Sequence, residues 1–305
     1  MNGPDPEGLN VLGAVGTVIS HVEVQMAIKS LQQPGSGRTF KLGRKRPIAR
    51  GPHFRLRNYL MRELPPPPTA CDYTKSASSA LAKVYCNDKL GDCVIAGIGH
   101  VVGVLTGNAN KKPFLYTDAQ IIELYGAIGG YVPGHPNTDE GCDEQTALNY
   151  WENNGAPKGS THTIAGWLSV NGTDSVECRT ALWLFENLYF GIELPDAWVN
   201  PMPSRSNFVW DVAGAPDQDN GHCVVGVGYT AKGVTIATWG MTGLITDAAI
   251  AKYATIVGQG ELYAVVSQDG ISKAKQKAPN GFDWSQLVAD FDSMGGGARR
   301  LPGRR

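Results

Sequence analysis

Beyond residue 69, the hydrophobic pattern has a helical period in the first half of the chain and a strand pattern in the second. A helix is expected to begin at Cys93, because the apolar positions after it recur at intervals of three and four residues. These positions are Ile95, Ile98, Val101, Val102 and Leu105. Further helices are expected after Thr117, over Glu144–Trp151 with an end at Asn154-Gly155, and from Asp174-x-x-Glu177 through Leu184.

Short apolar runs bounded by turn residues dominate the second half and predict strands. The expected strands are Tyr189–Leu194, His222–Tyr229, Gly233–Trp239 and Glu261–Val266. This order predicts an α+β fold, with a helical subdomain, a C-terminal antiparallel β subdomain, and a cleft between them.

The first 68 residues have a different pattern and are expected to form an N-terminal extension. A helix is predicted from about Leu9 to Leu31, followed by a Gln-Gln-Pro-Gly-Ser-Gly segment and a basic stretch. Pro65–Pro68 favour an extended linker without backbone donors. The predicted division is therefore 1–68 for the extension, 69–270 for the main domain, and 271–305 for a C-terminal helix with a basic tail.

Composition adds few constraints. The 305 residues are 42% hydrophobic and 18% charged with a net charge of −1, which is typical of a globular protein. Six cysteines are too few for a disulfide scaffold and indicate reduced thiols. The N-terminus lacks the pattern of a secretory signal, and polar residues interrupt Leu9–Ile28, so neither export nor a membrane span is expected. The expected location is cytoplasmic or virion-associated.

The charge is uneven, since ten Lys or Arg residues and no acidic residue lie between Lys29 and Arg62. Such a run is typical of a solvated arm, but it would also suit a partner with an anionic surface, such as nucleic acid or a particle. A third interpretation is a propeptide or docking arm that lies across the cleft.

Candidate chemistry begins at Gly91-Asp92-Cys93, where a loop gives way to the predicted helix. Asp92 could cap this helix, and Cys93 would lie in its first turn, where the helix dipole favours a thiolate. The charge of Asp92 opposes this effect, so the thiolate needs a cationic partner. His222 lies 129 residues later, next to Gly221 at the start of a predicted strand, and could supply that partner.

These segments resemble the papain superfamily of cysteine peptidases, which pair a cysteine at the head of a central helix with a histidine on a strand. The family's His-Ala-Val-x-x-Val-Gly-Tyr resembles His222–Tyr229, and its Asn-Ser-Trp-Gly resembles Ala237-Thr238-Trp239-Gly240. The resemblance implies that Asn87, six residues before Cys93, stabilises the oxyanion with the Cys93 N–H. It also implies that Trp239 shields the Cys–His pair and that Gly91, Asp92, Gly221 and Trp239 border the substrate.

The chain departs from that pattern at the third catalytic position. The family's asparagine falls on Ala237 when the Trp-Gly pair is aligned, and on Thr238 when His222 is aligned without gaps. A threonine hydroxyl can accept the imidazole N–H, more weakly than a carboxylate. Cell-wall hydrolases with a cysteine-led helix have a much shorter interval between cysteine and histidine. The chain also resembles phage and bacterial proteins with Asn-Asp-x-Leu-Gly-Asp-Cys and Thr-Trp-Gly segments.

The sequence therefore predicts a cysteine hydrolase, a peptidase or amidase, that acts on a peptide or peptidoglycan peptide through an acyl-enzyme on Cys93. No metal or organic cofactor is expected. The alternative is a papain-fold structural or interaction protein of a phage virion or other particle, with little or no activity.

Overall fold

The computed structural model describes residues 28–47, 54–278 and 280–293. Its helices are α1 Ser78–Leu81, α2 Cys93–Asn110, α3 Asp118–Gly129, α4 Glu144–Asn154, α5 Ser175–Phe185, α6 Asp196–Val199, α7 Asp247–Tyr253, α8 Gln268–Lys277 and α9 Trp284–Ser293. Its strands are β1 Lys29–Gln32, β2 Thr39–Leu42, β3 Cys71–Asp72, β4 Gly166–Ser169, β5 Leu188–Glu193, β6 Phe208–Trp210, β7 Gly221–Thr230, β8 Gly233–Thr238, β9 Met241–Ile245 and β10 Glu261–Val266. The helices and strands expected after residue 69 are therefore present.

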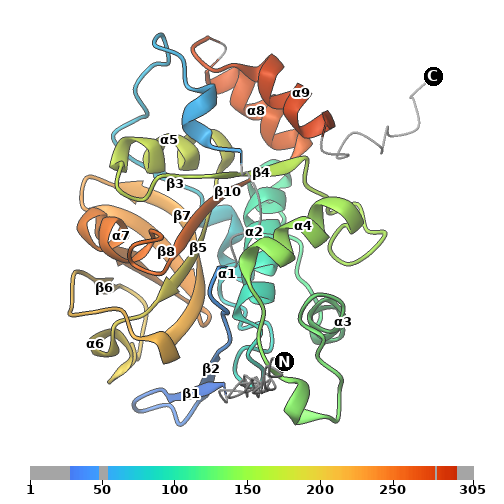
Figure 1. The fold of residues 1–305 in the computed structure, drawn as a ribbon, viewed down its shortest axis with the longest axis vertical. Coiled ribbons are helices and arrows are strands. Elements are labelled where there is room, and N and C mark those ends of the chain that lie inside the picture. Colours follow the sequence, from blue (N-terminus) through green and yellow to red (C-terminus); the bar gives the residue numbers. More distant parts are fainter. Residues whose placement is uncertain (1–27, 48–53, 279, 294–305) are drawn as a thin grey trace, which may run out of the picture.

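A large sheet forms the centre, with strands in the order β4-β10-β5-β7-β8-β9-β6 and β3 paired to β7. Every pair in it is antiparallel except β6–β9, which is parallel. In Figure 1 the helices α2, α3 and α4 lie on one side of this sheet, and α5 and α8 lie at its upper end. The α+β class is confirmed.

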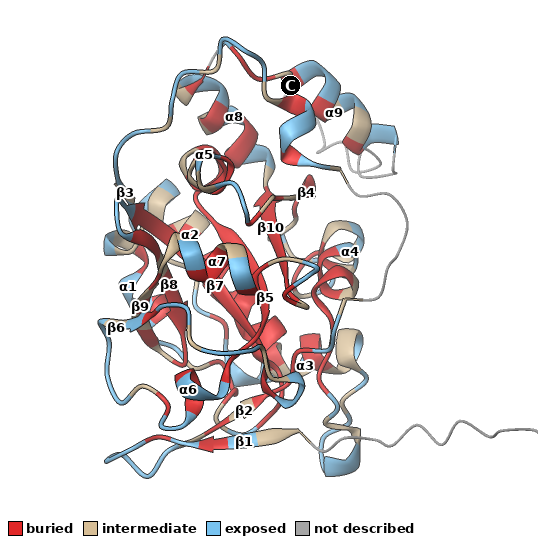
Figure 2. Cartoon of the chain, turned by 60° about the vertical axis from the view of Figure 1, so that its left-hand side comes forward, coloured by how far each residue is buried: buried red, intermediate tan, exposed pale blue. Residues whose placement is uncertain are grey.

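Both faces of the central strands are buried, as their colour in Figure 2 shows. The alternation of side chains along β10 is an example: Leu262 and Ala264 join one hydrophobic cluster, whereas Tyr263 and Val265 join the other. The second cluster includes the apolar face of α2, which packs directly on β7. A strand that is buried on both faces has a continuous apolar sequence, which is why these runs were recognisable.

Three helices begin at side-chain caps, of which those at Thr117 and Asp174 were predicted and that at Asp143 was not. The Thr117 side chain accepts from the Gln120 N–H in a full capping box, and the Asp143 side chain caps α4. The Asp174 carboxylate accepts from the amides of Val176 and Glu177, which is half of the expected capping box; the Glu177 carboxylate accepts from the Asn171 N–H at 2.9 Å instead.

The prediction of a helix up to Leu31 is wrong for its last residues, because Lys29–Leu31 belong to β1, and residues 9–27 lie outside the described ranges. β1 pairs with β2 around a turn in which Gly35 and Gly37 have positive φ. The alternation in Thr39–Leu42, which buries Phe40 and Leu42, is a strand signal with period two. The basic stretch is accordingly not simply a solvated arm, since Leu31, Phe40 and Leu42 are all buried.

Candidate active site

Cys93 is the first residue of α2, as predicted, and it is 2% exposed. The expected cap is wrong, however: the Asp92 side chain makes no capping hydrogen bond, and both of its buried carboxylate oxygens lack a hydrogen-bond partner among the residues that the structure describes. Burial raises the pKa of Asp92 well above its usual value, which favours the neutral acid. The repulsion expected between Asp92 and a Cys93 thiolate is correspondingly small.

The strands β7 and β8 bring His222 to Thr238. The His222 Nε2 atom lies 2.7 Å from the Thr238 hydroxyl oxygen, and both side chains are buried. Ala237 pairs with Val225 in the hydrophobic core, away from the imidazole. Ala237 and Thr238 were the two candidates for the third catalytic residue, and Thr238 is the one that contacts the histidine. The other ring nitrogen, His222 Nδ1, has no hydrogen-bond partner among the described residues.

Trp239 stacks on His222, with ring centroids 4.5 Å apart and planes inclined by 23°. Thr238 and Met241 pair across the β8–β9 hairpin, so Trp239 and Gly240 are its two turn residues, with φ of 53° and 73°. Two positive φ values are the signature of a type I′ turn, in which a bulky residue such as tryptophan is strained. Such strain is typical of functional sites, and here it places an indole face against the imidazole.

One small cavity is lined by residues of the helical side and by residues of the sheet side. Its lining includes the predicted residues Asn87, Cys93, His222, Thr238 and Trp239, together with Val84, Ala96, Gly97, His100 and Cys223. Its volume of about 10 Å³ corresponds to no more than about one water molecule. The structure thus brings five of the eight predicted site residues together, in a closed state.

The titratable groups reflect this closure. Burial raises the pKa of Cys93 to about 12, although backbone amides of Gly43 and Cys223 act in the opposite direction. Burial, with a smaller contribution from His100, lowers the pKa of His222 to about 3. Both groups are therefore neutral at pH 7, as a thiol and an imidazole rather than an ion pair.

The segment that closes the cavity comes from the N-terminal extension. We call residues 39–45 the strap; in Figure 1 the end of the dark blue chain, after β2, runs upward between the sheet and the α2–α4 side. The Asn87 side chain donates to the Lys41 carbonyl at 2.9 Å, and the Lys41 N–H donates to the Asn87 carbonyl at 2.9 Å. The amide predicted to hold an oxyanion is thus occupied by a carbonyl of the same chain.

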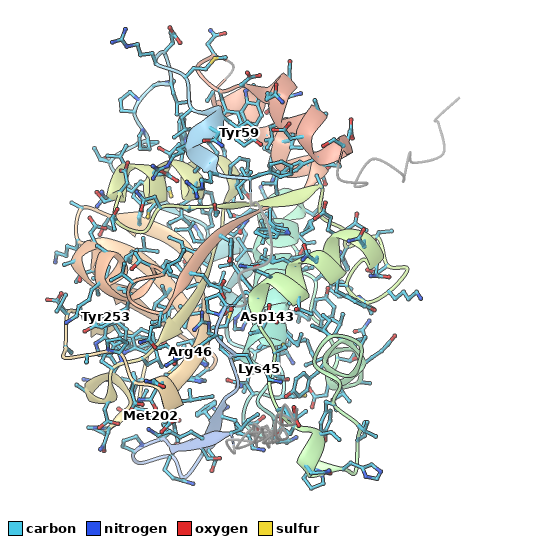
Figure 3. The ribbon with its side chains drawn as sticks, viewed as in Figure 1. Lys45, Arg46, Tyr59, Asp143, Met202 and Tyr253 are labelled. Atoms are coloured by element: carbon cyan, nitrogen blue, oxygen red, sulfur yellow. The ribbon has the colours of Figure 1, made fainter. Side chains whose placement is uncertain are left out.

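Farther along, the strap bridges the two walls of the cleft through its backbone. On the helical side, the Cys142 N–H donates to the Gly43 carbonyl and the Lys45 N–H donates to the Cys142 carbonyl, both at 3.0 Å. On the sheet side, the Arg44 N–H donates to the Gly221 carbonyl at 3.1 Å. Figure 3 labels Lys45 and Arg46 between these walls, with Asp143 nearby.

Glycines make this passage possible. A Cβ on Gly43 would lie 1.7 Å from the Gly91 carbonyl oxygen, and one on Gly141 would lie 1.8 Å from the Gly43 carbonyl oxygen. A Cβ on Gly221 would lie 2.4 Å from the carbonyl oxygen of Arg44. Gly91 and Gly221, predicted to border a substrate, therefore border the strap, whereas Asp92 is buried beneath and does not line the cavity.

The sequence analysis missed the environment of the Arg44 side chain, which is fully buried. Its guanidinium contacts the carboxylates of Glu144, Glu193 and Glu261 at 3.1, 3.0 and 3.1 Å. A sequence signal existed, since Glu193 and Glu261 are the only charged residues of the apolar strands β5 and β10. Acidic residues in strands that are buried on both faces need partners.

No group of His, Cys, Asp and Glu side chains suited to a metal ion occurs in the described part of the chain. Within the same residues, α2 alone is long and apolar enough to cross a membrane, and 72% of that window is buried inside the protein, as in a core helix.

Neither a family model nor a curated protein sequence matches this chain. Among solved structures, xylellain, a cysteine protease from Xylella fastidiosa, matches with 15% identity and a TM-score of 0.53, over 78% of this chain and 98% of that one. Procathepsin L 3 from the larval midgut of Tenebrio molitor matches at 13% identity over 70% of this chain and 76% of its own, with a TM-score of 0.49. The expected resemblance is confirmed at the level of architecture: the chain has the fold of the papain-like cysteine proteases.

Proposed function

We propose that this protein is a cysteine hydrolase of peptide bonds, with Cys93 as nucleophile and His222 as its base, held in a closed form by its own strap. One observation carries the proposal. Thr238 engages His222 Nε2 and leaves Nδ1 without a partner, in a cavity that Cys93 also lines. A histidine that is oriented through one nitrogen and free at the other is arranged to move a proton.

The reaction follows from these groups. His222 Nδ1 takes the proton of the Cys93 thiol, and the sulfur attacks the substrate carbonyl carbon, forming a C–S bond. The Asn87 amide and the Cys93 N–H stabilise the oxyanion. The C–N bond then breaks as His222 gives its proton to the leaving amine. Water attacks the thioester, passes a proton through His222 to the departing sulfur, and releases the acid.

In the closed form the strap occupies the groups that the reaction needs. The Gly43 N–H acts on the Cys93 thiol and opposes the effect of burial on its pKa. The Asn87 amide is already engaged by Lys41. Activity therefore requires that the strap leave the cleft.

The test is cleavage of denatured casein by the Gly43→Ala variant, in which the strap no longer fits. Hydrolysis that is lost in the Gly43→Ala/Cys93→Ser protein, but kept in a Gly43→Ala/Cys142→Ser control, supports the proposal. Cys142 is the matched control because it is another buried free cysteine bordering the strap.

The second candidate function is that of a papain-fold interaction protein without activity, such as a particle component. The neutral Cys93 and His222 in the closed cavity favour it. Absence of hydrolysis in a folded Gly43→Ala protein whose strap has left the cleft would select this alternative.

A further inference from the structure

The most elaborate polar site in the described residues lies beside the nucleophile and encloses the side chain of Arg44. Its carboxylates come from both walls of the cleft: Glu144 begins α4, whereas Glu193 ends β5 and Glu261 begins β10. The guanidinium donates from Nε to Glu144, from Nη1 to Glu193 and from Nη2 to Glu261. A further bond runs from Nη1 to the Gln259 carbonyl at 3.2 Å.

From this arrangement we infer that the cleft is selective for arginine, and that Arg44 occupies a site for an arginine side chain of the substrate. The inference rests on the proposed function and names its substrate class. We call the site formed by Glu144, Gly191, Glu193, Gln259 and Glu261 the arginine pocket.

The arginine pocket is shaped by its walls. Gly191 forms part of its floor, and a Cβ there would lie 2.4 Å from Arg44 Nε, so any larger residue would fill the space of the guanidinium. Glu261 is held independently of Arg44, because its other carboxylate oxygen accepts from the Tyr263 hydroxyl at 2.5 Å and from Gln145 at 3.4 Å. Such support orients a carboxylate before a ligand arrives.

The arginine pocket also has carboxylate oxygens that could accept further hydrogen bonds. Within the described ranges, one oxygen of Glu144 and one of Glu193 are buried without a hydrogen-bond partner. Burial raises the pKa of Glu144 well above its usual value and that of Glu193 to about 7, while Arg44 opposes both shifts. Arg46, which is 44% exposed, lies 3.6 Å from Glu193 and is the other cation at this site. Without a guanidinium at the centre the three buried carboxylates are unfavourable, and a planar guanidinium reaches all three, which the single ammonium of lysine cannot.

The arginine pocket lies close to the proposed nucleophile, Cys93. Arg44 follows Gly43, whose N–H acts on the Cys93 thiol, and apart from the Arg44 side chain the walls hold these two residues through backbone hydrogen bonds. A peptide that replaces the strap can form the same backbone bonds if it carries glycine at the position of Gly43, and these bonds place no demand on its side chain at the position of Arg44. The side chain that enters the arginine pocket is then what the cleft selects.

The first test uses the Gly43→Ala protein and fluorogenic peptides that contain one arginine, scanned across positions. Replacing arginine by citrulline, which has the same shape without the charge, is expected to lower kcat/KM about 100-fold at one position. Lysine is expected to rank between the two. Equal cleavage of the arginine and citrulline peptides would overturn the inference while leaving the proposed hydrolase function intact.

The second test does not need activity. Arg44→Ala removes an ethylguanidinium group from the full chain, and adding ethylguanidinium is expected to restore several degrees of the lost Tm, whereas neutral N-ethylurea restores none. Arg44→Lys serves as a second variant if Arg44→Ala does not fold, and it should unfold at a lower temperature than wild type. Equal effects of ethylguanidinium and N-ethylurea, or an unchanged Tm in Arg44→Lys, would contradict the pocket. Rescue without any peptide hydrolysis would support the pocket and refute the proposed function.

Discussion

The substitution Gly43→Ala tests whether the strap controls access to Cys93. The added Cβ would lie 1.7 Å from the Gly91 carbonyl oxygen, and side-chain carbons essentially never approach closer than 3.0 Å, so the strap must move by roughly 1.3 Å at this point. The atoms that the new Cβ would meet belong to the Gly91 backbone, so the contact cannot be relieved by the movement of a flexible side chain. The hydrogen bonds of Gly43 with Cys142 and of Arg44 with Gly221, at 3.0 and 3.1 Å, cannot survive that shift.

The expected consequence is a large increase in the reactivity of Cys93. Its pKa is raised to about 12 in the closed state from an ordinary value of 9.0, mainly by burial. Restoring the ordinary pKa multiplies the thiolate fraction at pH 7 by about 10³. Iodoacetamide labelling of Cys93 is therefore expected to accelerate about 1000-fold, or more if His222 adds further stabilisation.

Peptide mapping by mass spectrometry measures this rate, with Cys178 as an internal reference because it is buried far along the chain in α5. Lys45→Ala is the matched control, since it removes a half-exposed strap side chain that forms only a surface ion pair with Glu140. A Gly43→Ala protein that is folded by circular dichroism but labels Cys93 no faster than Lys45→Ala would refute the reasoning.

Three further predictions concern the imidazole and its turn. Thr238→Val should lower kcat about fivefold in the Gly43→Ala protein, because one hydrogen bond of about 1 kcal/mol is lost, whereas Thr238→Asn should retain most of the activity. Gly240→Ala should lower the free energy of unfolding, measured in urea, by more than Gly214→Ala does. Both glycines have positive φ, but only at Gly240 would a Cβ lie 2.8 Å from a backbone carbonyl oxygen. Equal losses in the two variants would contradict the close packing of this turn. The pKa of His222 is lowered from 6.5 to about 3, so unfolding takes up a proton between these values and stability falls as the pH drops below 6.5. His222→Gln should therefore reduce the slope of unfolding free energy against pH by up to about 1.4 kcal/mol per pH unit. Glu193, whose pKa is raised to about 7, changes stability in the opposite sense, and it does so in both proteins. An unchanged slope would count against a buried neutral imidazole.

Much of the fold after residue 69 could be predicted from the sequence, because the central strands are buried on both faces and have continuous apolar sequences. The β5 and β7 runs are of this kind, and α2 has a clear helical period after Cys93. The strand β1, by contrast, has four residues with a single buried side chain, Leu31, which is too short a signal to separate a strand from a helix end.

The pairing of Cys93 with His222 in one cavity could be expected from two local patterns, each with its own glycine and turn signals. The arginine pocket could not, because Arg44, Glu144, Glu193 and Glu261 lie on four separate elements that meet only through the tertiary fold. A basic stretch has the same composition whether it is solvated or inserted into a cleft.

The cap expected at Asp92 failed for a related reason. An acidic residue directly before a helix is a standard cap pattern, but this carboxylate is buried and neither oxygen has a partner in the described part of the chain. Its environment depends on the packing around Asn87 and the strap, which no local pattern contains.

The pairing of Cys93 with His222 is tested most directly by the pH dependence of Cys93 alkylation in the Gly43→Ala protein, measured with and without His222→Ala. We expect rapid labelling that persists below pH 7 in Gly43→Ala and is lost when His222 is replaced, because a thiolate–imidazolium pair forms once the strap has left. Labelling that follows the titration of an ordinary thiol in both proteins would contradict the proposed catalytic pair.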